Sequence, residues 1–329
     1  MASPPRRPGT IRRTSTADIT IETVPRPLLR VAGIARDLLS TSGSAADPGV
    51  VLGTATMTVV VDVESRSITE LSVTPARWQD PLGSLIERPA QSGFRKALRA
   101  CAPELVDSGS PLATLLDDLP VCLLISGNLH LRFTHEGIVG TKQSHPRADV
   151  CAGWQTNGEL QTLAERSGSS PLTLGPPSGE LADPADPAGW HDVRPLGEWS
   201  MRRARRLDLL VQDDGGIRAD AYLRDVRRLA EARPRTVHEY SVRALIDRVG
   251  TVRTVEAVPH VLPAPECPQA VASAQRLERL RVDDLRAHVA KEFTGISTCT
   301  HLNDMLRTLG DARYLVASDP RGPRIRPLT

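Results

Sequence analysis

Two segments in the last third of the sequence carry side chains suited to metal binding or to nucleophilic and acid–base chemistry. "TCTHLNDMLRTLG" (298–310) begins with Cys299 and His301, and "LPAPECPQAV" (262–271) places Cys267 in a proline-rich stretch before a predicted helix. The helix dipole lowers the pKa of a thiol in the first turn. We therefore expect Cys299 to be biased toward thiolate, the form that binds metals or attacks.

The segment after Cys299 has the pattern of a helix with one buried face. Its apolar residues recur at the required spacing: Leu302, Met305, Leu306 and Leu309. Ser297 or Thr298 is the expected N-cap, and Gly310 the expected stop.

A third segment, "TVHEYSVRALID" (236–247), alternates in the manner of a β-strand. Alternation places His238 and Tyr240 on the apolar face and Glu239 on the opposite one. Taken alone, His238 is also compatible with a hydrogen-bonded core histidine, and Glu239 with a solvated side chain.

Together these groups predict a metal or catalytic site. We expect Cys267, Cys299 and His238 to hold the metal, with His301 and Glu239 as catalytic acid–base groups. Two thiolates with an imidazole or a carboxylate suit zinc or iron better than magnesium or calcium. Three protein ligands would leave a fourth position open for water or substrate.

An upstream segment, "DVCAGW" (149–154), is expected to line the same pocket. Its Cys151 and Trp154 are the candidates, together with Tyr240 of the strand.

Composition limits the class of protein. The 329 residues carry a formal net charge of +2, which gives no reason to expect nucleic acid or an acidic membrane surface as a partner. The longest apolar run, "LPVCLLISG" (119–127), is too short to span a bilayer. No signal peptide is recognisable, and five scattered cysteines do not suggest a disulfide framework, so reduced thiols in the cytoplasm are expected.

The two ends of the sequence resemble each other in order. "RRTSTADI" (12–19) matches "RRARRLDL" (202–209), "TVVVD" (58–62) matches "RALID" (243–247), and "LATLLDDL" (112–119) matches "CTHLNDML" (299–306). The offsets between matches are nearly constant, which predicts an internal duplication.

We therefore expect an α+β fold of two related units, each an antiparallel sheet followed by helices packed on one face. Residues 1–120 form the first, degenerate unit, and residues 191–329 form the second unit with the site. An insert and a Pro/Gly-rich linker occupy 121–190. The reactive residues of the second unit have no counterparts in the first.

The sequence resembles an uncharacterised bacterial family, domain of unknown function 2889. The similarity is carried by "VHEYSVRALID", "LPAPECPQAVASAQRL" and "TCTHLNDMLRTLG", with "DVCAGW" and "LLDDLP" upstream. This resemblance implies no established activity.

More distantly, the order of elements is similar to iron–sulfur scaffold proteins of the NifU/IscU type and their zinc-binding SufU relatives. In this resemblance Glu239 takes the place of the scaffold's strand-entry aspartate, and Cys267 and Cys299 correspond to its later cysteines. The first scaffold cysteine has no clear equivalent, and His238 is the closest substitute.

Three functions follow as hypotheses. The first is a cytoplasmic enzyme acting on a small molecule through a metal or thiolate site. The second is a metal or iron–sulfur carrier, whose partner would be another protein. The third is a metal-free binding module.

Overall fold

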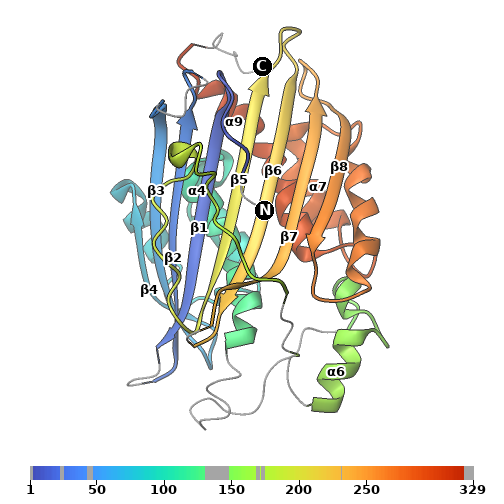
Figure 1. The fold of residues 1–329 in the computed structure, drawn as a ribbon. Helices are drawn as coiled ribbons and strands as arrows, with labels where there is room; N and C mark the ends of the chain where they lie inside the picture. The colour runs from blue at the N-terminus through green and yellow to red at the C-terminus, as the bar shows by residue number, and fades with distance from the viewer. Residues whose placement is uncertain are drawn as a thin grey trace.

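Eight antiparallel strands form one continuous sheet in the order β4-β3-β2-β1-β5-β6-β7-β8 (Figure 1). The computed structural model describes residues 3–22, 26–42, 47–129, 148–167, 171, 175–230 and 232–321. The strands are β1 (Ile11–Glu22), β2 (Leu28–Leu39), β3 (Val50–Asp62), β4 (Ile68–Thr74), β5 (Ser200–Val211), β6 (Ile217–Arg228), β7 (Arg235–Ile246) and β8 (Val252–Val261).

The strand pairing at the centre of the sheet differs from the predicted fold. β1 pairs with β5 from Ile11 opposite Leu209 to Thr20 opposite Ser200, so the expected two units with separate sheets are wrong. An unpaired strand edge exposes a row of backbone N–H and C=O groups, and β1 and β5 satisfy each other's edge by pairing. The two similar segments that suggested separate units are these central strands. The boundaries at residues 120 and 190 stay predictions.

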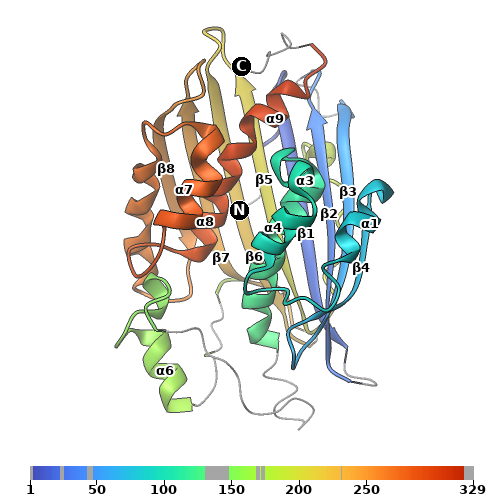
Figure 2. The same cartoon turned by 180° about the vertical axis from the view of Figure 1, so that it is seen from behind.

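Apart from the helix at Glu159–Ser167, which lies beyond one end of the strands, the longer helices lie on one face of the sheet (Figure 2). The α-helices are α1 (Gln79–Gly83), α2 (Phe94–Cys101), α3 (Pro103–Asp107), α4 (Pro111–Ile125), α6 (Glu159–Ser167), α7 (Leu285–Glu292), α8 (Thr300–Thr308) and α9 (Ala312–Ala317). The 3-10 helices are η1 (Ala76–Trp78), η2 (Ser126–Leu129), η3 (Ala152–Trp154), η4 (Pro187–Gly189), η5 (Cys267–Leu277), η6 (Val282–Asp284) and η7 (Leu309–Asp311). Within the described part of the chain, no helix is long and apolar enough to cross a membrane.

Two apolar clusters form the core beneath these helices. One joins β1–β4 to α1–α4, and the other joins β5–β8 to η5 and α7–α9. As predicted, Leu302, Met305, Leu306 and Leu309 are all buried in the second cluster.

A network of ion pairs, most of them buried, lies between the two clusters, with the side chains of Arg95 and Arg286 partly exposed. It comprises six arginines and six aspartates: Arg13, Arg95, Arg203, Arg205, Arg286, Arg307, Asp37, Asp117, Asp118, Asp225, Asp304 and Asp311. Its formal charges cancel, which allows charged side chains to lie in an interior where an unpaired ion would be strongly unfavourable. The network joins the sheet to α4 and α8.

Segments with little regular secondary structure cover the opposite face of the sheet. The N-terminal residues and the segment from 175 to 199 cross it, and Arg6 binds Asp186 with Nη2 and Oδ1 2.7 Å apart. His191 lies beneath this cover, where its ring nitrogens are 2.9 Å from Thr14 Oγ1 and 2.8 Å from Thr16 Oγ1.

Candidate functional site

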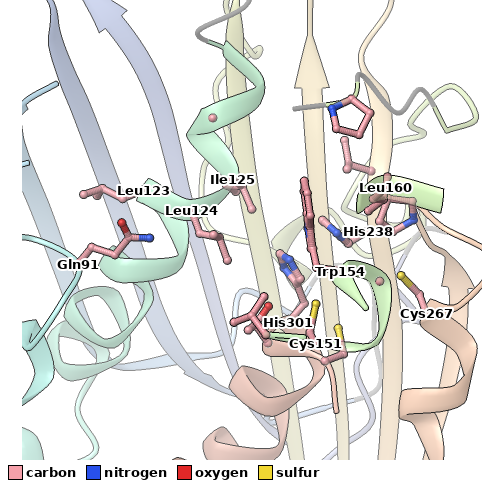
Figure 3. A pocket seen from close by; sticks show the side chains of 18 of the residues that line it. Gln91, Leu123, Leu124, Ile125, Cys151, Trp154, Leu160, His238, Cys267 and His301 are labelled. Carbon is pink, nitrogen blue, oxygen red and sulfur yellow. The ribbon is translucent and has the colours of Figure 1, made fainter. Parts of the chain in front are cut away.

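A cavity of about 270 Å³ opens on the helical side of the sheet, where several elements meet. Its walls come from the end of α4, from η3 and α6, from the start of β7, and from the starts of η5 and α8 (Figure 3). The predicted residues Cys151, Trp154, His238, Cys267, Cys299 and His301 all line it.

Two histidines share one buried carboxylate at the sheet side of the cavity. Nδ1 of His301 lies 2.9 Å from Oδ2 of Asp225, and Nδ1 of His238 lies 3.2 Å from the same oxygen. The two imidazole rings stack with their centroids 3.6 Å apart and their planes 21° apart. Each side chain therefore turns Nδ1 toward the carboxylate, which leaves Nε2 as the nitrogen available to the cavity.

Arg203 fixes the charge of this carboxylate from behind. Its Nη1 lies 3.1 Å from both oxygens of Asp225, and its Nη2 lies 2.9 Å from Asp304. Burial alone would raise the pKa of Asp225, but the Arg203 guanidinium and the bonds from the two histidines outweigh it and hold that pKa well below its usual range. Because an ionised carboxylate only accepts hydrogen bonds, a histidine that bonds to it does so by donating Nδ1–H. Nδ1 of His301 also lies 3.4 Å from Nη1 of Arg203.

The same surroundings keep His238 neutral at physiological pH. Burial, followed by the electrostatic effect of His301 and offset in part by Asp225, lowers the pKa of His238 to about 4. A neutral imidazole with Nδ1–H engaged carries a lone pair on Nε2, as a general base requires.

Asp225, His238 and His301 also form a candidate metal cluster in the described part of the chain, since their ligand atoms all lie within 4.8 Å of one another. Two imidazoles and a carboxylate suit zinc or iron. The ring orientation fits a metal poorly, because an ion bound by Nδ1 must lie in the plane of each imidazole. Near-parallel planes 3.6 Å apart do not meet beside both rings. Arg203 adds a cation beside the ligands, so the observed geometry favours hydrogen bonding.

Three buried thiols line another wall of the cavity, one on each of three separate segments: Cys151 before η3, Cys267 at the start of η5, and Cys299 before α8. Burial, with the neighbouring Cys299, raises the pKa of Cys151 to about 11 and that of Cys267 to about 12. Burial also raises the pKa of Cys299, although a hydrogen bond with Tyr240 and two backbone N–H groups oppose it. The expected bias of Cys299 toward thiolate is therefore wrong, since burial outweighs the helix N-terminus.

The start of α8 differs in detail from the prediction. Cys299 itself is the N-cap residue, in extended conformation, rather than Ser297 or Thr298. Its carbonyl accepts a hydrogen bond from the backbone N–H of Asn303, 2.8 Å away. This arrangement presents His301 from the first turn of the helix to Asp225.

The segment of η3 and α6 covers one side of the cavity, and we call residues 148–167 the cap. The Ala152 N–H donates to the Thr298 carbonyl over 2.9 Å, and the Glu159 N–H donates to Oε1 of Glu266 over 2.9 Å. A Cβ on Gly153 would lie 2.7 Å from Sγ of Cys267, so only glycine permits this close approach. The cap therefore docks directly on the thiol wall.

Glu239 does not share the site. It lies on the opposite face of the sheet, where Tyr222 donates a hydrogen bond to Oε1 of Glu239. Strand alternation predicted this separation from His238, and it makes Glu239 unsuited to act with the cavity histidines. Tyr240, which was expected to line the pocket, is not among the described lining residues; it lies behind the cavity, next to Cys299.

Sequence reasoning missed the two residues that organise the histidines, Asp225 and Arg203. Both lie in charged segments of the sequence, "LRDV" and "MRRARR". A charged residue is buried in a strand only when it is paired, so a charge within a strand-like segment was the available signal.

Residues 201–315 match the family model described as a protein of unknown function, DUF2889. The predicted resemblance to this family is confirmed over that segment, which spans β5 to α9 and contains Asp225, His238, Cys267, Cys299 and His301. No curated protein and no solved structure matches the chain significantly. Nothing supports the expected likeness to the NifU/IscU scaffolds. The cap and α4, which complete the cavity, lie outside the DUF2889 segment.

Proposed function

We propose that this protein is an enzyme that transfers protons to and from a small molecule held in the cavity. The observation that carries the proposal is the stacked pair of His238 and His301 on the ionised Asp225, at the wall of a cavity of about 270 Å³. Perturbed titratable groups in a concave, partly apolar site are typical of catalytic centres.

The pair is suited to hold a single proton. Two imidazolium rings stacked 3.6 Å apart would repel each other, so one ring is protonated at a time. His238 accepts a proton on Nε2, and the carboxylate of Asp225 stabilises the resulting imidazolium. His301, bonded to the same oxygen, serves as the complementary donor. Arg203 maintains the charge of Asp225 without contacting the cavity.

The proton positions can be tested without a substrate. In ¹⁵N NMR spectra at pH 7, His238 should show a protonated Nδ1 and an unprotonated Nε2. Asp225→Asn should disturb this tautomer preference, whereas His260→Gln, at an exposed ring on β8, should not. A His238 ring that is charged at pH 7 would refute the proposed base.

Catalytic conversion is tested by incubating the protein with a panel of small organic molecules and following their masses over time. The parent and His260→Gln should convert the same compound, while His238→Gln and His301→Gln should each bind it and fail to convert it. Undiminished conversion by both variants would defeat the acid–base role. Binding without conversion by the parent would instead support the binding module.

A metal-holding protein is the second candidate, favoured by the spacing of Asp225, His238 and His301. Elemental analysis of protein purified with and without oxygen distinguishes the possibilities. Stoichiometric zinc or iron lost in His301→Gln would support this cluster. Metal lost in Cys267→Ser and Cys299→Ser would support the ligand set expected from the sequence, and an oxygen-sensitive iron chromophore would support a carrier. Cys101→Ser is the control, because Cys101 does not line the cavity.

A further inference from the structure

The surface of the cavity offers a ligand almost no charge. Among the described lining residues none is lysine, aspartate or glutamate, and Arg66, the one arginine, already has an interaction partner. The thiols of the wall are protonated at neutral pH, because burial raises their pKa values. An ion that enters such a cavity loses its hydration without gaining a counter-charge, so the lining favours an uncharged molecule.

The histidine pair requires a hydrogen-bond donor from that molecule. Nδ1 of His238 is directed at Asp225, which has no exposed surface, while 10% of the His238 side chain stays exposed. The exposed part of the ring is therefore its Nε2 side, in the lining of the cavity. Since His238 is neutral at pH 7 and Nδ1 carries the proton, Nε2 can only accept a hydrogen bond. A ligand that reaches it must supply an O–H or an N–H.

The other walls of the cavity are largely apolar and suit a flat ring. Figure 3 shows Trp154 of the cap near the rings of His238 and His301, with Leu124 and Ile125 on the α4 side. An indole face together with aliphatic side chains favours an aromatic group. An apolar cavity of ~150 Å³ is large enough to bind benzene. The volume of about 270 Å³ therefore leaves room for one substituted ring.

From these features we infer that the cavity binds a small, uncharged aromatic ring that carries a hydrogen-bond donor, of which phenol is the simplest example. The ring lies against Trp154, and its O–H or N–H donates to Nε2 of His238. A hydroxyl group provides one donor without the charge that a carboxylate or an amine would bring into the cavity. The inference names the substrate class of the proposed enzyme and rests on the proposed function only for the word substrate.

Calorimetry on the full chain with four probes tests this binding: phenol, anisole, cyclohexanol and benzoate. The parent should bind phenol most tightly, because anisole lacks the donor, cyclohexanol is not flat, and benzoate is charged. His238→Phe removes the acceptor, so it should weaken phenol binding about three- to tenfold and leave anisole binding unchanged. Trp154→Leu should remove the preference for phenol over cyclohexanol.

Matched variants separate lost binding from lost folding. Unchanged anisole binding shows that His238→Phe folds with an intact cavity. His238→Gln, whose amide oxygen is also an acceptor, should keep the preference for phenol over anisole. His260→Phe, at an exposed ring on β8 outside the cavity, is the control and should bind all four probes as the parent does.

The dye 4-nitrophenol reports the state of the bound hydroxyl in the parent protein, because its phenolate is coloured and its phenol form is not. The cavity should bind the uncharged form, so the phenolate absorbance at pH 7 should fall as protein is added. A tenfold preference for the uncharged form raises the pKa of the bound dye by about one unit.

Four results would overturn the inference: a rise in phenolate absorbance, equal affinity of the parent for phenol and anisole, tightest binding of benzoate, or no phenol binding at millimolar concentration. Failure of the proposed catalysis is seen separately. Phenols that bind to the parent without being converted would support the inference and the binding module. Conversion of another class of compound, without phenol binding, would support the enzyme and overturn the inference.

Discussion

Acidification should destabilise this protein through two buried histidines, His191 and His238. Burial is the largest cause in both cases, and the pKa of each falls from 6.5 to about 4. Each ring stays neutral in the folded state, whereas the unfolded chain takes up a proton as the pH falls below 6.5. The two neutral rings therefore contribute to the free energy of unfolding above pH 6.5, and this contribution is lost as the pH falls toward 4.

The magnitude follows from these two pKa values. One pKa unit corresponds to about 1.4 kcal/mol, and between pH 7 and pH 4.5 each histidine should cost about 2 kcal/mol of the free energy of unfolding. The two rings lie on opposite faces of the sheet, so their contributions should add.

Urea unfolding at pH 7, 5.5 and 4.5 measures this loss. His191→Gln and His238→Gln should each reduce the difference in unfolding free energy between pH 7 and pH 4.5 by about 2 kcal/mol, and the double variant by about twice as much. His260→Gln, at an exposed ring, should lose as much stability as the parent. The same pH dependence in all four variants would show that the buried rings are not held neutral.

Three further predictions concern the ion network, the cap and the thiols. Arg203→Met should lower the free energy of unfolding by about 3–5 kcal/mol, measured with urea at pH 7, because it leaves buried carboxylates without their cation; a loss below about 1 kcal/mol would contradict this. Gly153→Ala should force the cap away from Cys267, and hydrogen exchange should show faster exchange of cap amides while the central strands stay protected. Cys299 should react with a thiol reagent at pH 7.5 only when the protein unfolds, whereas half-buried Cys101 should react in the folded state; rapid labelling of native Cys299 would disprove its predicted inertness.

Local patterns predicted the elements of the site well. The spacing of leucines placed the buried face of α8, and alternation in β7 placed His238 and Glu239 on opposite faces of the sheet. Both patterns depend on neighbours within one element, so a single segment of sequence contains the information.

These local patterns could not predict which strands pair when the strands are far apart in the sequence. The similarity of "RRTSTADI" to "RRARRLDL" suggested two related units, and nothing in either segment indicated that the two strands pair with each other. Asp225 was likewise invisible as the partner of His238 and His301, because only the folded sheet and α8 bring the three together. The prediction of a low pKa for Cys299 was wrong for a related reason, since the burial of this thiol depends on the cap and η5.

The pairing of β1 with β5 has a consequence for how the chain folds. Arg12 and Asp208, which meet across this pair, are 196 residues apart, and the central ion network likewise needs α4 together with α8. Contacts of such sequence separation slow folding, because the loop must close before they stabilise anything. During synthesis β1 to β4 emerge with a charged, unpaired edge at β1 and must wait for β5. On the ribosome, the pairing at the middle of the sheet therefore cannot form before β5 has been synthesised, and the ion network cannot be completed before α8 has been synthesised.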